Sequence, residues 1–175
     1  MALLILDLDE TLIFGTEEGL STSADFEITR FQVYKRPFLD DFLRICAAHF
    51  DLAVWSTASE YYVISVTEKV FQDHCDLKFV WDYARCVYTL DDENGEYFFL
   101  KNLDRVAELG YPIEQILIVD DTPQKIRNHH ENGIIVSPFY GDAGDLELQR
   151  LGEFLRKIKD SDDFRTVDKN GWRGE

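Results

Sequence analysis

Two groups of carboxylates each follow directly after a short apolar run. Asp7 and Asp9 come after the run LLIL, and Asp120 and Asp121 come after the run ILIV. Four carboxylates gathered in one place would repel one another unless a cation is shared among them. Hard oxygen ligands favour Mg²⁺, which keeps several waters and is commonly completed by a substrate phosphate. The pattern therefore indicates a magnesium site that serves phosphate chemistry.

The two-residue spacing of Asp7 and Asp9 lets both side chains point at one centre, because alternate residues of an extended chain share a face. One carboxylate could then attack a phosphorus atom while the other carries a proton, as in enzymes that form an aspartyl-phosphate intermediate. The phosphoryl oxygens would need positive charge and hydrogen-bond donors. Lys101 is the candidate cation, and Ser56 and Thr57 are the candidate donors.

These polar residues lie at the ends of elements that alternate along the chain. Apolar runs predict strands, and apolar residues spaced by three and four predict helices. Strands are expected at 3–6, 51–56, 116–119 and 134–136, with helices at 38–50, 62–70, 102–109, 125–132 and 146–158. Such alternation predicts an α/β fold with a parallel sheet and helices on both faces. Ligands bind beyond the carboxyl ends of such a sheet, so the polar residues would converge there if their strands are neighbours.

The regions between these elements are less regular. Residues 14–29 mix Gly, Ser, Thr and acidic residues, and we expect a loop with at most a short strand. Lys35 and Arg36 either offset nearby acids or line the entrance for a phosphate. Residues 72–100 contain alternating stretches on both sides of the turn-forming segment 91–95, which predicts a small β-insert or hairpin.

Charge and cysteine content limit the classes of partner. The 175 residues carry a formal net charge of −16, which disfavours nonspecific binding to nucleic acid or to an anionic membrane. Cys46, Cys75 and Cys86 form no C-x-x-C pair, so a reduced intracellular setting is expected. The apolar start of the chain ends at Asp7 and is too short for a signal peptide or a membrane span. We therefore expect a cytoplasmic protein.

Four motifs, taken in order, resemble those of a known superfamily. The segment DLDET at 7–11, a hydroxyl residue after the second strand, Lys101 and the pair Asp120–Asp121 resemble the motifs of the haloacid-dehalogenase (HAD) phosphotransferases. The DxDxT pattern and the stretches VYKRP, VWSTAS, FLKNLDRV and LIVDDTP are closer to the FCP/SCP-type phosphatases, which include the small RNA polymerase II C-terminal-domain phosphatases. The resemblance runs from about Leu3 to about Phe139, and four ordered motifs are far more specific than the first alone.

The resemblance implies a role for each residue of the first and third motifs. Asp7 would be the nucleophile, and Asp9 would be the general acid and base, with its backbone carbonyl at the metal. Lys101 would neutralise the phosphoryl oxygens and Asp7. Thr11 would support substrate binding by bracing the loop that carries both aspartates.

The second and fourth motifs supply the remaining groups that the resemblance implies. Ser56 would bind the phosphoryl group, although an alignment shifted by one residue gives this role to Thr57. Asp121 would bind Mg²⁺, and Asp120 would do so directly or through a neighbouring ligand. Some members of the family carry an amide at the position of Asp121, so the aspartate makes this site more anionic and would tighten metal binding.

The resemblance implies a Mg²⁺-dependent phosphomonoester hydrolase that acts through a phospho-aspartate. Residues 1–159 would form a Rossmann-like HAD phosphatase domain with the insert at about 72–100 and no large cap, followed by a polar C-terminal tail at 160–175. An open site without a cap favours phosphorylated proteins or peptides, and phosphoserine, phosphothreonine and phosphotyrosine all remain open. The alternatives are a small-molecule phosphatase of the same superfamily, acting on a phosphometabolite, and a catalytically weak binding module.

Overall fold

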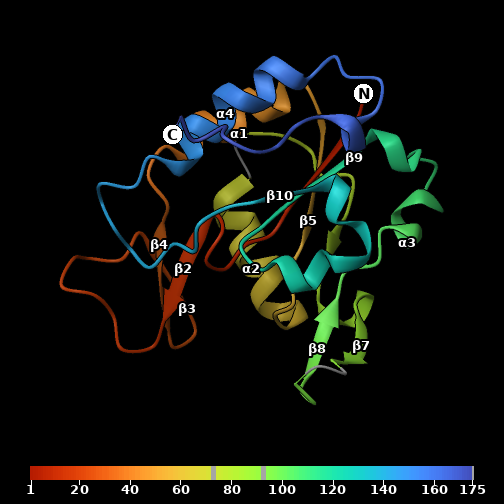
Figure 1. Ribbon diagram of the computed structural model, residues 1–175. Coiled ribbons are helices and arrows are strands. Elements are labelled where there is room, and N and C mark those ends of the chain that lie inside the picture. Colours follow the sequence, from red (N-terminus) through yellow and green to blue (C-terminus); the bar gives the residue numbers. More distant parts are fainter. Residues whose placement is uncertain (72–73, 92–93, 175) are drawn as a thin grey trace.

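The computed structural model describes residues 1–71, 74–91 and 94–174 and contains a central five-stranded sheet (Figure 1). The sheet consists of β1 (Leu3–Leu6), β5 (Asp51–Trp55), β6 (Val80–Trp81), β9 (Ile116–Asp120) and β10 (Gly133–Ile135). Neighbouring strands are parallel in the order β10-β9-β1-β5-β6, so β1 is the middle strand. The four predicted strands are present, and β6 adds an edge strand whose two residues are too few to be predicted.

Both faces of this sheet are covered, which explains why its strands are apolar throughout. Side chains alternate along β1, with Leu4 and Leu6 in one buried cluster and Leu3 and Ile5 in another. The first cluster is completed by α1 (Leu39–Ala47), α2 (Glu60–Phe71) and α4 (Glu147–Ile158), and the second by α3 (Asp104–Ala107) and the 3₁₀ segment η3 (Pro123–Asn132). The predicted α/β fold with helices on both faces is confirmed (Figure 1).

One of the predicted helices has a different form. The helix expected at 125–132 is a kinked 3₁₀ segment, with non-helical backbone at Ile126 and His129. It spans the gap between the end of β9 and Gly133, close to the shortest connection that can join parallel neighbours. Ile126, one of the two residues at which the segment departs from helical geometry, is buried within this short crossover. No helix in the described ranges is long and apolar enough to cross a membrane.

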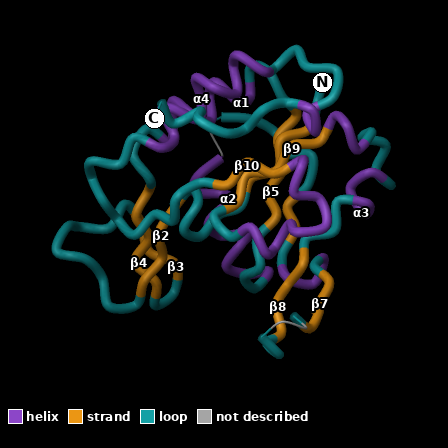
Figure 2. Tube along the Cα trace, viewed as in Figure 1, coloured by secondary structure: helices purple, strands orange, loops and turns teal. Residues whose placement is uncertain are grey.

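A second sheet lies beside the first and corrects the expected loop at 14–29 (Figure 2). It consists of β2 (Ile13–Thr16), β3 (Phe26–Ile28) and β4 (Phe31–Lys35), antiparallel in the order β2-β4-β3. These strands are short and mostly half-exposed, so their residues show little of the apolar alternation that predicts a strand. Pairing with β4 across the intervening loop stabilises them instead.

The predicted insert contains the antiparallel hairpin of β7 (Val87–Leu90) and β8 (Tyr97–Leu100), preceded by the 3₁₀ turn η1 (Tyr83–Arg85). Residues 72–73 and 92–93, at the predicted start of the insert and in its turn, lie outside the described residues. Val80–Trp81 falls within the predicted insert but pairs with β5 in the main sheet. The hairpin ends directly before Lys101 and so brings that lysine to the edge of the sheet.

The segment predicted as a polar C-terminal tail packs against the domain. Phe164 is fully buried, in η4 (Phe164–Thr166), with its ring centroid 6.2 Å from that of Phe50. Near the end of the segment, Arg173 donates to the Glu147 carboxylate at 2.8 Å and to the carbonyl of Ile135 at 2.7 Å. These contacts tie the segment to the core, while a domain boundary at 159 stays a prediction.

We expect Phe164→Ala to lower the free energy of unfolding by about 3–5 kcal/mol, because it removes a large buried side chain and leaves a cavity. Urea denaturation followed by tryptophan fluorescence measures the change. Tyr61→Ala is the matched control, since that aromatic side chain is 67% exposed on α2. Equal losses in the two variants would show that the C-terminal segment does not contribute to the core.

Candidate active site

The order and register of the central strands bring the predicted site residues together. Leu6, the last residue of β1, is level with Val119 of β9 and Val54 of β5. The Asp7 N–H continues the ladder by donating to the carbonyl of Val119 at 3.0 Å. The residues that follow these strands therefore meet at one edge of the sheet, as the sequence predicted.

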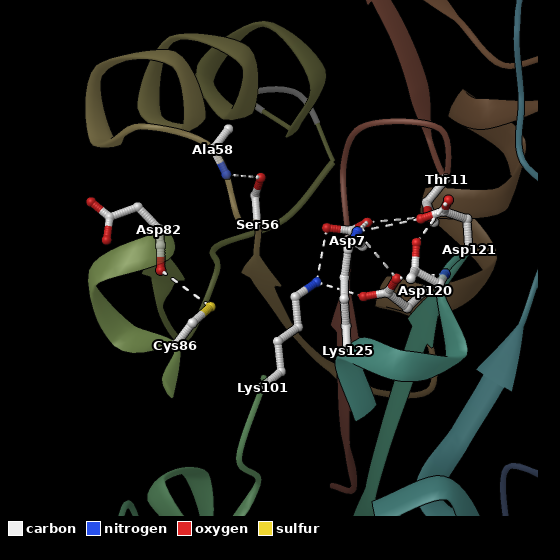
Figure 3. Close-up of polar contacts among 11 residues, drawn as sticks. Asp7, Thr11, Ser56, Ala58, Asp82, Cys86, Lys101, Asp120, Asp121 and Lys125 are labelled. Carbon is white, nitrogen blue, oxygen red and sulfur yellow. Dashed lines mark hydrogen bonds and ion pairs between the residues drawn. The ribbon is translucent and has the colours of Figure 1, made fainter. Parts of the chain in front are cut away.

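Asp7 and Asp120 are joined there by a buried lysine (Figure 3). The ammonium of Lys101 lies 2.9 Å from Asp7 Oδ1 and 2.6 Å from Asp120 Oδ2. All three side chains are almost completely excluded from solvent. Burial alone would lower the pKa of Lys101, but the two carboxylates outweigh it and raise that pKa. The lysine is therefore a permanent cation inside the domain.

A second lysine, Lys125, was missed in the sequence. Its ammonium lies 3.3 Å from Asp7 Oδ2, 3.4 Å from Asp120 Oδ1 and 3.4 Å from Asp121 Oδ1. Its place four residues after Asp121, in the segment leaving β9, is the one feature that could have drawn attention to it. Burial disfavours the ionised form of Asp7, but the charges of Lys101 and Lys125 outweigh burial and lower its pKa. Asp7 is thus held as an anion.

The carboxylates of Asp7, Asp120 and Asp121 also form the group best suited to a metal ion. Each offers one oxygen within 4.8 Å of the others. All three donors are hard carboxylate oxygens, so the set fits Mg²⁺. The side chain of Asp9 lies outside this group, and the predicted role of its backbone carbonyl at the metal stays a prediction.

The side chain of Asp9 accepts a hydrogen bond that the sequence did not reveal. The Tyr62 hydroxyl, on α2, donates to Asp9 Oδ1 at 2.7 Å. Burial raises the pKa of Asp9, and the net result of burial, this hydrogen bond and the neighbouring charges is a pKa of about 6. A carboxyl group with this pKa can exist in both protonation states near neutral pH, as a general acid and base requires.

The loop between β1 and β2 is stabilised by hydrogen bonds of Thr11 and Arg36. The Thr11 hydroxyl donates to Asp7 Oδ2 at 3.4 Å, and the backbone carbonyl of Thr11 accepts a hydrogen bond from Arg36 Nη1 at 3.0 Å. Arg36 also binds Asp145 through Nε and Nη2, at 3.0 and 2.8 Å. Arg36 is buried, and Lys35 pairs with Asp40 at 3.3 Å. These contacts favour the first of the two alternatives for Lys35 and Arg36, that they offset nearby acids rather than line the entrance for a phosphate.

The two candidate hydroxyls lie together after β5. Ser56 is buried, and its Oγ accepts a hydrogen bond from the N–H of Ala58 at 3.0 Å, so it stabilises the turn into α2 (Figure 3). Thr57 is half-buried at the next position. Both lie at the edge of the sheet that holds Asp7, and the choice between them as the phosphate-binding hydroxyl stays open.

We expect Tyr62→Phe to raise the pKa of Asp9 above its value of about 6. The hydroxyl stabilises the ionised carboxylate, so its loss favours the protonated form. At pH 6, where the wild-type group is about half ionised, the variant should be mostly protonated. Carboxyl ¹³C NMR of the aspartates against pH measures this. Tyr61→Phe, on the exposed side of α2, should leave the titration unchanged; a Tyr62→Phe curve that overlays it would remove Tyr62 from the site.

Comparison with known proteins gives a consistent family. A family model described as NLI interacting factor-like phosphatase matches residues 2–165. "CTD nuclear envelope phosphatase 1B" of Danio rerio is 30% identical over 94% of this chain and 70% of its own length. "CTD small phosphatase-like protein 2" of Dictyostelium discoideum is 30% identical over 93% of this chain but 28% of its own length. "Carboxy-terminal domain RNA polymerase II polypeptide A small phosphatase 2" of Mus musculus is 30% identical over 93% of this chain and 59% of its own length. The chain thus spans less than two thirds of two of these three relatives.

Solved structures support the same fold. A structure of the fission yeast RNA polymerase II CTD phosphatase Fcp1 bound to beryllium fluoride superimposes with a TM-score of 0.62. The superposition covers 90% of this chain and 62% of the Fcp1 chain, and the two sequences are 16% identical. At this level of identity the likeness shows the fold alone, which is the α/β arrangement described above.

Proposed function

The chain belongs to the family of NLI interacting factor-like phosphatases, and we propose that it is a Mg²⁺-dependent phosphomonoester hydrolase with Asp7 as its nucleophile. The observation that carries this proposal is the state of Asp7. Its carboxylate is kept ionised at the end of the middle strand by the buried ammonium of Lys101, with Lys125 as a second cation beside it. An anion fixed in this way, next to a carboxyl group that can exchange a proton, is the arrangement that nucleophilic catalysis requires.

In the first step, an oxygen of Asp7 forms a bond to phosphorus as the bond from phosphorus to the substrate oxygen breaks. Protonated Asp9 gives its proton to the leaving oxygen, which departs as a neutral alcohol. Lys101 lies 2.9 Å from Asp7 Oδ1 and is placed to offset negative charge on the phosphoryl group. The product of this step is a phospho-aspartate and ionised Asp9.

In the second step, ionised Asp9 takes a proton from water as the water oxygen attacks the phosphorus atom. The bond to Asp7 breaks, phosphate leaves, and both aspartates return to their starting states. Asp7, Asp120 and Asp121 would hold Mg²⁺, which supplies positive charge for the phosphoryl oxygens when it is bound. Ser56 or Thr57 would donate a hydrogen bond to the same oxygens.

We infer that the substrate is a phosphorylated protein or peptide. Two features support this choice: the small insert beside the site and the names of relatives such as "CTD nuclear envelope phosphatase 1B". We also propose a cytoplasmic location, because Cys46, Cys75 and Cys86 form no C-x-x-C pair in the sequence. A panel of phosphoserine, phosphothreonine and phosphotyrosine peptides, compared with phosphometabolites in the presence of Mg²⁺, tests the substrate class. Preference for a metabolite would favour the small-molecule alternative.

We expect Asp7→Asn to lower turnover of an aryl phosphate by about 10⁴-fold or more, because the amide cannot act as the nucleophile. Circular dichroism should show an intact fold. Asp41→Asn provides a matched control, since Asp41 is exposed on α1 and pairs with Arg44 of the same helix at 2.8 Å. Near-normal activity of a folded Asp7→Asn protein would exclude Asp7 as the nucleophile, and inactivity of wild type on every phosphate would support the binding-module alternative.

We expect Asp9→Asn to slow the hydrolysis of an alkyl phosphate by about 10²–10⁴-fold, because the leaving oxygen loses its proton donor. An aryl phosphate, whose leaving group hardly needs a proton, should still give a rapid burst of phenol. Turnover should then stall, since no base activates water for the second step. Stopped-flow absorbance resolves the two phases, and steady turnover at the wild-type rate on both substrates would show that Asp9 has only a structural role.

A further inference from the structure

Lys125 contacts the same three carboxylates that form the candidate metal site. Its ammonium lies 3.3 Å from Asp7 Oδ2 and 3.4 Å from both Asp120 Oδ1 and Asp121 Oδ1. The oxygens of this group lie within 4.8 Å of one another. An ammonium and a metal ion attracted by the same oxygens would occupy nearly the same space.

The two lysines of the site are held in different ways. Lys101 is completely buried and, within the described part of the chain, forms ion pairs with Asp7 and Asp120. Lys125 contacts all three carboxylates, and its side chain is 19% exposed. Lys125 can therefore leave the cluster for solvent by rotating its side chain, whereas Lys101 has no such exit.

The backbone of Lys125 is fixed, so only its side chain would have to move. Its N–H donates to the carbonyl of Thr122 at 3.1 Å, and its carbonyl accepts a hydrogen bond from the N–H of Lys101 at 2.7 Å. Release of the ammonium therefore needs no rearrangement of η3 or of the hairpin that leads into Lys101. The rigid backbone also keeps the ammonium near the cluster, ready to return.

The net charge of the cluster favours the exchange of the Lys125 ammonium for a metal ion. Without a cation, the carboxylates of Asp7, Asp120 and Asp121 would repel one another, and Lys101 alone would leave a net negative charge in a largely buried place. With both lysines and a divalent ion in contact, the cluster would be overcharged in the opposite sense. With Lys101 in place, the Lys125 ammonium offsets part of the remaining negative charge, and a divalent ion in its place would offset all of it, so the cluster does not need both cations at once.

We propose that the Lys125 ammonium is a built-in counter-ion that occupies the metal position in the metal-free protein and is displaced when Mg²⁺ binds. The inference rests on the metal site of the proposed function and assigns this lysine a part in it that is distinct from that of Lys101. Lys125 then sets the affinity for metal, because every binding event must first break its contacts with the three carboxylates. It also keeps the metal-free protein folded by relieving their repulsion.

The test compares wild type with Lys125→Met, which keeps the length of the side chain and removes its charge. Isothermal titration of Mg²⁺ into the EDTA-treated full chain, and electron paramagnetic resonance with Mn²⁺, measure metal affinity without any substrate. Thermal unfolding with and without saturating Mg²⁺ measures stability. Lys159→Met is the matched control. It makes the same change in charge, and among the described residues Lys159 forms an ion pair with its neighbour Asp160, away from the cluster.

We expect Lys125→Met to bind Mg²⁺ and Mn²⁺ about tenfold more tightly than wild type, within the range typical of coupled binding events. Its metal-free form should unfold about 5 °C lower than wild type, because the cluster has lost a counter-ion. Saturating Mg²⁺ should close this gap, since Lys125 is outside the cluster in the metal-bound protein. Lys159→Met should bind metal as wild type does and show no Mg²⁺-dependent difference in stability.

The opposite results would overturn the proposal. Equal or weaker metal binding by Lys125→Met, or a loss of stability that persists in saturating Mg²⁺, would show that Lys125 stays in the cluster beside the metal. Tighter binding by Lys159→Met to the same degree would assign the effect to overall charge. Failure of wild type to bind any metal would overturn both this inference and the metal site of the proposed function. The assignment of Asp7 as the nucleophile would still be tested separately by Asp7→Asn. If metal-free Lys125→Met does not fold, Lys125→Gln takes its place with the same expectations.

Discussion

Repulsion among carboxylates at the end of the middle strand is the constraint on which the rest of the structure depends. Asp7 follows β1 and Asp120 ends β9, and the parallel pairing of these two strands brings the carboxylates close together. A buried lysine between them, at 2.9 and 2.6 Å, makes their burial possible. The pairing of β1 with β9 therefore depends on Lys101, which follows the hairpin of β7 and β8 in another part of the chain.

The neighbouring elements serve to deliver and hold these charges. The hairpin of β7 and β8 ends at Lys101, whose N–H is anchored on the carbonyl of Lys125. On the other side, Arg36 links the carbonyl of Thr11 to Asp145, which lies far along the chain before α4. The loop that carries Asp7 and Asp9 is thus held by residues from distant parts of the chain, Arg36 at Thr11 and Lys101 at Asp7. A site fixed in this way is organised before a ligand arrives, which is what electrostatic catalysis needs.

Much of this arrangement could be predicted, because it depends on local patterns. Apolar runs identified β1, β5, β9 and β10, and the polar residues after them indicated where a site would form. The position of Lys101 followed from the order of the motifs. By contrast, β2, β3 and β4 were largely missed, since half-exposed strands of a few residues acquire their stability from pairing rather than from their own sequence.

The parts of the site that escaped prediction share one physical cause. Tyr62 reaches Asp9 from α2, and Arg36 reaches Asp145 across more than half of the chain. Such contacts depend on how helices and sheets pack, and no spacing in the sequence encodes them. Lys125 is close in sequence to Asp121, yet a regular helix at 125–132 would have suggested a solvent-exposed ion pair. In the structure Lys125 lies in the first turn of η3, directly after β9, and contacts all three carboxylates. Its contact with Asp7 depends on the pairing of β1 with β9, which the spacing of Lys125 and Asp121 in the sequence does not encode.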